Sequence, residues 1–113
     1  MYKSYENTII MTRGDNSYFD LEILDLEGDI AELPEDTTIT FTVKPNIYDN
    51  EPLITKDISL DALTVAILPE DTQNLEYGNY VYDVQVTYAD GAIDTIITPT
   101  PFILTGEVTF NYE

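Results

Sequence analysis

Carboxylates dominate the residues of this chain that could do chemistry. The chain holds 22 acidic residues among 113, and Asp25, Glu27 and Asp29, with Glu32 beyond them, carry acids at close spacing. Such oxygen donors are the ligands that Ca²⁺ favours. The spacing does not match the twelve-residue loop of an EF-hand, and Asp and Gly also form solvated turns readily. The sequence leaves a Ca²⁺ site and a plain hairpin turn open, and we assign no metal ligand.

A pair of carboxylates could also cleave a glycosidic bond by acid–base catalysis. The chain has no histidine and no cysteine, and no glycine-rich segment suited to cradling phosphate. Among so many acids a close pair is expected by chance, whereas a catalytic site needs several convergent groups. We therefore expect no enzymatic activity, no catalytic residue and no cofactor.

Two further sets of residues suggest binding. The segment Arg13-Gly14-Asp15 matches the adhesion motif that integrins bind, although it also fits a turn in which glycine takes a positive φ without penalty. Tyr18, Tyr48 and Tyr77 would form a sugar-stacking platform if they were exposed near one end of the fold. Each has a plain structural alternative that the sequence leaves open.

The charge of the chain excludes several partners. Four basic residues against 22 acids give a formal net charge of −18. Nucleic acids and anionic membranes are bound by clustered Lys and Arg, so we expect neither as a partner. A basic protein, cations or solubility alone remain as roles for the charge. No apolar run approaches membrane-spanning length and the N-terminus has no apolar signal segment, so we expect no signal peptide.

The elements that would position these side chains are β-strands. Apolar residues alternate with polar ones over 17–24, 37–44, 63–68 and 79–88, and β-branched residues are frequent over 92–98 and in the flanks of 6–12. Period-two alternation is typical of strands with one buried face. Gly, Pro, Asn and Asp predict turns at 25–29, 44–52, 89–91 and 98–101. Pro69 and the acids after it predict one short helical turn near 69–75.

Residues 77–91 carry a second signal. In the strand 79–88 the even positions, including Tyr80, Tyr82 and Tyr88, share one face, which we expect to line the core. Gly78 precedes Tyr80 by two residues, at the bend where a helical turn enters the strand. This is the local arrangement of a tyrosine corner, in which the hydroxyl bonds to backbone just upstream. We predict that Gly78, Tyr80 and Tyr82 form a structural corner, with Tyr82 in place of a disulfide cysteine.

Short strands with frequent turns in a chain of this length predict two packed antiparallel sheets. The fold class is therefore all-β: an immunoglobulin-like antiparallel β-sandwich of about seven to nine strands. We expect residues 1–113 to form one domain, in which 106–113 is either an extra strand or an assembly arm on a neighbouring subunit. Val108, Phe110 and Tyr112 alternate in that segment.

The motifs stand in a familiar order. They are "MTRGDNSYFDLEILDLEGD", "ITFTVKP", "PLITKDI", "ILPEDTQNLEYGNYVYDVQVTYADGAIDTI" and "GEVT". The chain resembles the immunoglobulin-like N-terminal domain of phage baseplate upper proteins and related small tail proteins from phages of Gram-positive bacteria. The resemblance covers roughly residues 12–109. Longer members of the family continue into a helical linker and a second domain, whereas this sequence stops at Glu113.

That resemblance implies a function. It implies a non-catalytic structural or binding module of a phage tail or baseplate, made in the host cytoplasm and located in the virion. Its partners would be other virion proteins or copies of itself in a homo-oligomer. The residues that we expect at an interface are acids on outward strand faces, which a basic partner would cover, and the C-terminal apolar residues: Asp20, Glu22, Asp83, Asp94, Val108, Phe110 and Tyr112. The alternative is a carbohydrate- or Ca²⁺-binding β-sandwich module of a cell-surface or carbohydrate-active system.

Overall fold

The alternating segments of the sequence form nine strands in the part of the chain that the computed structural model describes, residues 3–4 and 7–106. The elements are β1 (Lys3–Ser4), β2 (Ile9–Thr12), β3 (Ser17–Asp20), β4 (Ile23–Leu24), β5 (Thr38–Lys44), β6 (Ile54–Ile58), β7 (Thr64–Ile67), α1 (Pro69–Thr72), β8 (Gly78–Thr87) and β9 (Ile93–Thr105).

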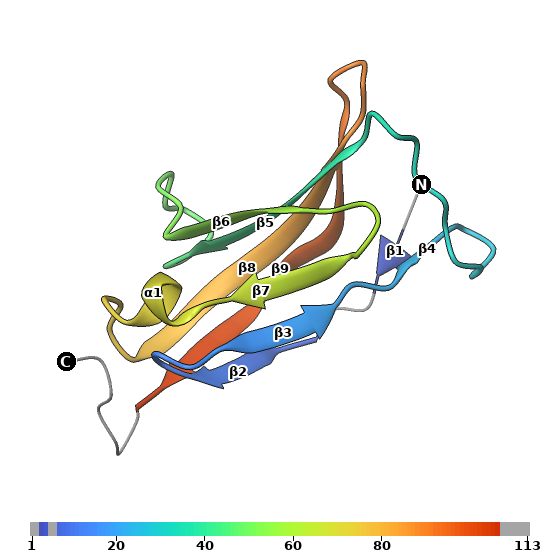
Figure 1. The fold of residues 1–113 in the computed structure, drawn as a ribbon. Coiled ribbons are helices and arrows are strands. Elements are labelled where there is room, and N and C mark those ends of the chain that lie inside the picture. Colours follow the sequence, from blue (N-terminus) through green and yellow to red (C-terminus); the bar gives the residue numbers. More distant parts are fainter. Residues whose placement is uncertain (1–2, 5–6, 107–113) are drawn as a thin grey trace.

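Five strands form one curled sheet in the order β2-β9-β8-β5-β6 (Figure 1). The long strand β8 pairs antiparallel with both neighbours and sets Val84 opposite Phe41 of β5 and Ile97 of β9. The prediction of purely antiparallel pairing is wrong at one edge, where β2 runs parallel to β9 with Ile9 opposite Phe102. The reason is topological, because β2 joins the last strand of the chain while β3, its successor in sequence, lies in another sheet.

A smaller layer covers one face of this sheet. It contains β3, which pairs antiparallel with β7, and the short pair β1 and β4. The rings of Phe19 and Phe41 meet edge to face across the two layers, with their centroids 5.9 Å apart. The predicted all-β sandwich is therefore confirmed, and the order β9-β8-β5-β6 corresponds to strands G, F, C and C′ of an immunoglobulin variable domain.

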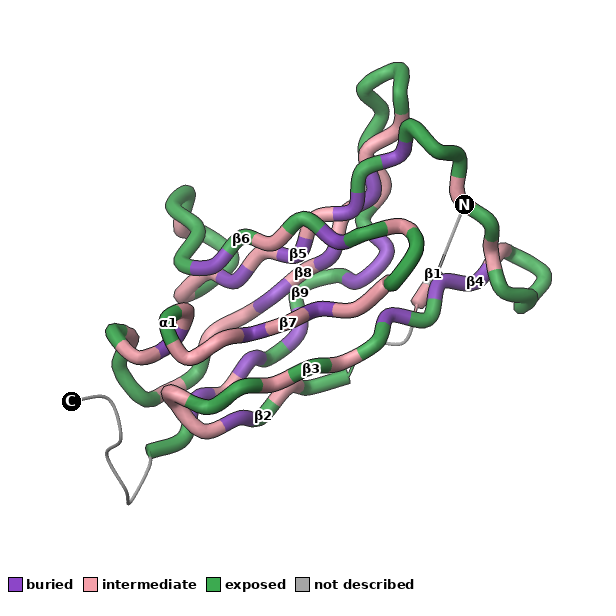
Figure 2. Tube along the Cα trace, viewed as in Figure 1, coloured by how far each residue is buried: buried purple, intermediate pink, exposed green. Residues whose placement is uncertain are grey.

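Alternation along β5 and β8 builds the core. Ile39, Phe41 and Val43 of β5 are completely buried, as are Val84 and Val86 of β8. Figure 2 shows buried positions separated by partly buried ones along both strands. Burying one such side chain contributes about 1.5–3 kcal/mol, so these two strands supply much of the apolar stabilisation. The intervening residues face away from the second layer.

Two local predictions change in the structure. The alternating run 17–24 is divided into β3 and β4, because β3 pairs with β7 whereas β4 turns away to pair with β1. The predicted helical turn near 69–75 is α1, a single turn ending at Thr72. The backbone N–H of Leu68 donates to the Asp71 carboxylate at 2.8 Å, which caps the start of the turn.

The prolines predicted to break the chain at 98–101 lie inside β9. Pro101 stands opposite Val81 of β8, and β2 pairs with β9 only from Phe102 onward. The register with β8 also shifts between Tyr82 and Val84. A strand tolerates proline at a bulge or where one side has no partner, because the missing N–H is not needed there. The strand therefore continues through the proline segment.

No helix in the described residues is long and apolar enough to cross a membrane. Strand β9 ends at Thr105, and the predicted extra strand or assembly arm, with Val108, Phe110 and Tyr112, lies outside the described residues.

Candidate functional site

The predicted corner stands where α1 leads into β8. The hydroxyl of Tyr80 donates to the backbone carbonyl of Glu76 at 2.6 Å, which is the upstream bond that the sequence predicted. Gly78, between them, has a φ of +142°, a region that side-chain-bearing residues rarely adopt. Tyr82 is buried one alternation further on, and its hydroxyl donates to the carbonyl of Asn7. Both tyrosines therefore fix backbone in place rather than presenting their hydroxyls to a ligand.

Burial raises the pKa of the Tyr80 hydroxyl above its ordinary value, and the nearby charge of Glu76 raises it further. The phenol stays neutral, as a hydrogen-bond donor to a carbonyl requires. The raised pKa therefore fits a hydroxyl that holds the backbone of the corner in place.

Arg13 fastens the β2–β3 turn to the same corner. Its Nη1 donates to the carbonyl of Leu75 at 3.2 Å, its Nη2 donates to the hydroxyl of Tyr77 at 3.1 Å, and its Cζ lies 4.3 Å from the centre of that ring. The next residue, Gly14, donates its N–H to the buried hydroxyl of Thr72 at 2.9 Å. We call these residues, with Glu76 and Tyr80, the clamped corner. The adhesion hypothesis is disfavoured because the arginine is engaged within its own fold.

Sequence reasoning missed this role of Arg13. The partners lie 62 and 64 residues away in the chain, so no local spacing connects them. The sequence offered one hint of a special role for Arg13: it is the single arginine in a chain with 22 acids.

Lys56 forms an ion pair with Asp71 of α1. Its Nζ lies 2.8 Å from Oδ2 of Asp71, the oxygen that also accepts the N–H of Leu68. Lys56 stands opposite Phe41 in the sheet, so it belongs to the inward face of β6. The ion pair therefore joins the edge of the large sheet to the helical turn beside the second layer.

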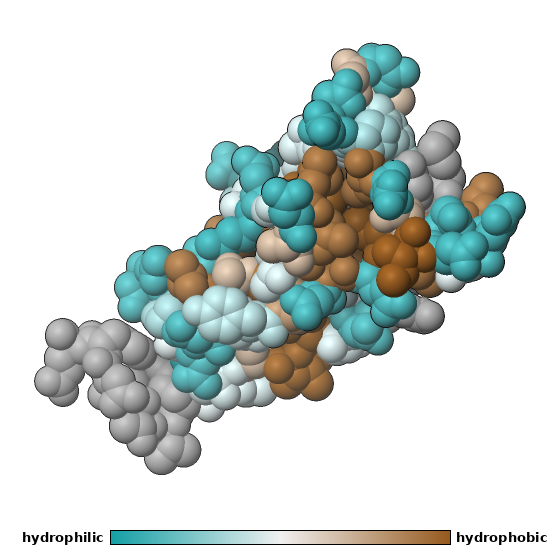
Figure 3. All heavy atoms as spheres, turned by 45° about the vertical axis from the view of Figure 1, so that its right-hand side comes forward, coloured by the Kyte–Doolittle hydropathy of each residue, from teal (hydrophilic) through white to brown (hydrophobic). Residues whose placement is uncertain are grey.

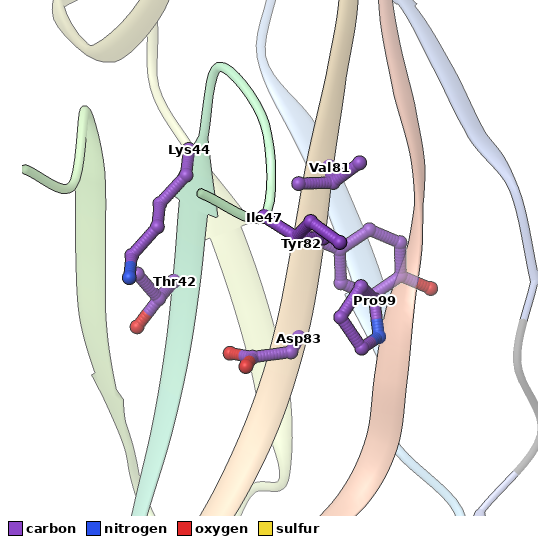
Figure 4. A pocket seen from close by; sticks show the side chains of 7 residues that line it. All are labelled: Thr42, Lys44, Ile47, Val81, Tyr82, Asp83 and Pro99. Carbon is purple, nitrogen blue, oxygen red and sulfur yellow. The ribbon is translucent and has the colours of Figure 1, made fainter. Parts of the chain in front are cut away.

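A small hollow of about 70 Å³ lies on the outer face of the large sheet (Figure 4). Thr42 and Lys44 of β5 and Asp83 of β8 line it, beside Val81 and Pro99. Burial raises the pKa of the Asp83 carboxyl, and the nearby ammonium of Lys44 acts in the opposite direction. One carboxylate beside one lysine can hold a small polar group, but it lacks the additional groups that catalysis needs.

The structure does not gather the acids predicted at an interface. Asp20 and Glu22 are exposed on and just after β3, whereas Asp83 lies on the outer face of the other sheet. Asp94 lies near the β8–β9 hairpin, where its Oδ2 accepts a bond from the Tyr88 hydroxyl at 3.2 Å. Asp83 and Asp94 lie on the neighbouring strands β8 and β9, whereas Asp20 and Glu22 lie on and beside β3 in the other layer, so the four acids do not form one surface.

The turn at 25–29 brings three carboxylates together. Oxygen atoms of Asp25, Glu27 and Asp29 lie within 4.8 Å of one another. Oδ1 of Asp25 accepts the backbone N–H groups of Glu27 and Asp29 at 2.9 and 3.1 Å, while Gly28 supplies a positive φ of +89°. Glu32 is not part of this cluster. The geometry is that of a tight acidic turn with carboxylate oxygens close enough to share a cation.

The three tyrosines proposed as a sugar platform come from three segments. Tyr48, in the β5–β6 loop, is 86% exposed, and Tyr18, on β3, is also exposed. Tyr77 carries the guanidinium of Arg13 over one face of its ring. These segments lie toward the same end of the sandwich (Figure 1), but the contacts of the described residues do not join the rings into one surface.

A groove of about 350 Å³ lies between β2 and β3. Its walls and floor come from both sheets and include Asn7, Ile9, Ile10, Phe19, Asp20, Leu21, Glu22, Tyr82 and Ile97. Two of the predicted interface acids, Asp20 and Glu22, therefore stand beside it. This groove borders the edge of β2 that has no strand partner among the described residues.

Comparison with known proteins adds no relative: no family model matches the sequence, and no curated protein matches it.

Proposed function

We propose that this chain is a non-catalytic structural module of a phage tail or baseplate, which assembles with other virion proteins or with copies of itself. The ordered motifs of the sequence support the proposal, and so does the form of the fold. A β-sandwich carries open strand edges, and these are common sites of pairing between chains.

The groove between β2 and β3 is the observation that carries the proposal. Strand β2 lies at one edge of the large sheet and has no partner on its other side among the described residues. It is uncharged over Ile9–Thr12, and Ile10 is 66% exposed. The opposite edge differs, because Lys56 of β6 points inward, and inward charges protect an edge from pairing. The β6 edge of the large sheet is therefore protected from pairing with another chain, and the β2 edge is available for it.

A strand from another chain would pair with the open side of β2 and set alternate side chains into the groove. Asp20 and Glu22 at the rim favour lysine or arginine on that strand. Such pairing gains affinity from backbone hydrogen bonds and specificity from the groove.

Self-assembly is tested by light scattering over a range of concentrations. We expect the mass to rise with concentration and Ile10→Lys to abolish that rise, because a charge on an edge strand opposes pairing. Leu26→Lys is the matched control, since Leu26 is 73% exposed but does not line the groove. Equal loss of assembly in both variants would contradict a role for β2.

Removal of residues 107–113 asks whether the C-terminal segment supplies the pairing strand. A lower mass after the deletion assigns the pairing strand to that segment, and an unchanged mass assigns it to another part of the chain or to another protein.

Placement in a virion has its own test. We expect mass spectrometry of purified particles to find this chain in fixed proportion to tail proteins, and the neighbouring genes to encode tail or lysis proteins. Absence from particles, with metabolic genes as neighbours, would remove the virion assignment while leaving the fold intact.

Ca²⁺ binding is a second candidate, favoured by the three close carboxylates at 25–29. It predicts that millimolar Ca²⁺ raises the melting temperature, since a ligand of the native state stabilises it. Asp29→Asn should remove the rise and Asp90→Asn, in the β8–β9 turn, should leave it. An unchanged melting temperature in the original chain would exclude this candidate.

A further inference from the structure

An apolar hollow opens at the end of the sandwich opposite α1. It has a volume of about 320 Å³, and it is lined by Ile23, Ala31, Glu32, Leu33, Glu35, Leu60, Asp61 and Leu63. We call it the acidic hollow, after the three acids in its lining. Figure 3 shows apolar side chains gathered on this side of the molecule, with hydrophilic ones around them. The volume is roughly ten times the ~30 Å³ of one water in the liquid, so a large side chain fits.

The floor of the acidic hollow is continuous with the core. Ile23 is buried, while Ala31, Leu33, Leu60 and Leu63 are partly buried and pack against the core cluster. The walls are held by backbone bonds, since the N–H of Ala31 donates to the carbonyl of Ile23 at 2.9 Å. The hollow is therefore a built feature of the fold.

Leu63 forms one wall in an unusual conformation. Its φ is +52°, a left-handed value that disfavours a branched apolar side chain. Its N–H donates to the carbonyl of Ser59 and its own carbonyl accepts the N–H of Leu21, which holds the strained backbone. Glycine would adopt this φ without strain, so leucine at this position supplies an apolar wall at a cost in backbone energy. Such outliers cluster at functional sites.

The rim of the acidic hollow carries charge of one sign. Glu32, Glu35 and Asp61 are all exposed there. The segment 20–36 contains eight acids and no base: Asp20, Glu22, Asp25, Glu27, Asp29, Glu32, Glu35 and Asp36. Arg13 and Lys56 are bonded near α1, and Lys44 lines the small hollow on the outer face. Lys3, whose side chain is not described, is the one base whose backbone lies at this end, opposite Leu24.

We infer that the acidic hollow binds a basic segment of a partner protein, with one apolar side chain inside it and lysine or arginine on either side facing Glu32, Glu35 and Asp61. Apolar walls provide the contact area, and the carboxylates select the charge of the partner. This surface is separate from the groove beside β2, so it adds a second binding site to the proposed assembly module.

The probe is the peptide acetyl-Lys-Arg-Leu-Phe-Arg-Lys-amide, titrated into the full chain at low ionic strength and followed by NMR and calorimetry. The test variant is Glu32→Gln/Glu35→Gln/Asp61→Asn. The control variant is Asp15→Asn/Glu51→Gln/Glu70→Gln, which neutralises three exposed acids elsewhere. Both variants change the formal charge from −18 to −15, so they separate local from overall attraction. Unchanged melting curves establish that both fold.

We expect the peptide to shift the amide signals of 23, 31–33, 35 and 60–63, and to bind about tenfold more weakly to the test variant than to the control. A second peptide with Gly-Ser in place of Leu-Phe should also bind about tenfold more weakly. Equal weakening in both variants, equal binding of both peptides, or no shifts in these residues would each overturn the inference. So would a doubled mass with these residues protected, which would assign the hollow to a second copy.

The outcome is independent of the assembly test. If Ile10→Lys abolishes self-assembly and the peptide does not bind, the proposed function stands and this inference fails. If the peptide binds a chain that stays monomeric, the inference stands and self-assembly through β2 fails.

Discussion

The clamped corner and the acidic hollow lie at opposite ends of one sandwich and use their polar groups differently. At the corner, Arg13, Thr72 and Tyr80 all bond to groups of their own fold. At the hollow, the exposed acids Glu32, Glu35 and Asp61 surround an apolar opening. The polar groups of the corner form hydrogen bonds within the fold, whereas those of the hollow are exposed to solvent.

Stability and binding should therefore depend on opposite ends of the molecule. Substitutions at the corner should change the free energy of unfolding, because they leave internal donors or acceptors without partners. Exposed charges interact weakly in water, so neutralising the acids at the hollow should change binding and leave stability nearly unaltered.

Tyr80→Ala should have the largest effect on stability. It removes a ring packed against the core and the bond to Glu76, and we expect a loss of about 2–3 kcal/mol in urea unfolding. Tyr80→Phe keeps the ring and should lose about 1 kcal/mol. Tyr48→Ala, in an exposed loop, is the control and should change little. A loss below about 0.5 kcal/mol for Tyr80→Ala would mean that the corner does not hold the fold together.

Two buried threonines, Thr72 and Thr37, differ in whether their hydroxyls have a partner. Thr72→Val leaves the N–H of Gly14 without its acceptor and should cost about 1–3 kcal/mol. Thr37 is also buried, just before β5 on the side of the acidic hollow, but its hydroxyl has no partner among the described residues. Thr37→Val should therefore be neutral or stabilising in the same unfolding measurement. Equal losses in the two variants would contradict the assigned roles.

The ion pair beside α1 should have a smaller effect. Asp71→Asn weakens both the contact with Lys56 and the cap on Leu68, so we expect a loss of about 1 kcal/mol. Lys56→Met should lose less, because it keeps the cap and the apolar stem of the side chain. Asp57→Asn, an exposed neighbour, serves as the control. If Lys56→Met destabilises more than Asp71→Asn, the ion pair with Lys56 contributes more to the free energy of unfolding than the cap on Leu68 does.

Asp83→Asn gives the smallest effect, and its size depends on pH. Burial raises its pKa in the folded state, so its contribution to stability is largest below the ordinary value and is lost as the pH rises through the raised pKa. At neutral pH, Asp83→Asn should therefore increase stability, by less than about 0.5 kcal/mol. The gain should shrink toward pH 3 in parallel unfolding curves. A decrease in stability at neutral pH would show that the contact with Lys44 outweighs burial.

Local pattern predicted much of the fold. The alternation of Ile39, Phe41 and Val43 predicted one buried face, and all three are completely buried. Gly78 and Tyr80 predicted a bend and an upstream hydroxyl bond, because both depend on residues within a few positions. Strand β6 was not found by alternation, since Lys56 occupies an inward position where the pattern expects an apolar residue. Its acidic partner lies on α1, outside any local window.

The alternation in the sequence was enough to locate strands such as β5 and β8 and to assign their buried faces, since side chains alternate with a period of two whatever the strand pairs with. No local pattern predicted the pairing of β2 with β9, the position of Arg13 over Tyr77, or the meeting of segments 31–35 and 60–63 around an apolar hollow. These contacts join segments that are distant in the sequence, and which of them form depends on competition among all the strand edges and faces of the folded chain.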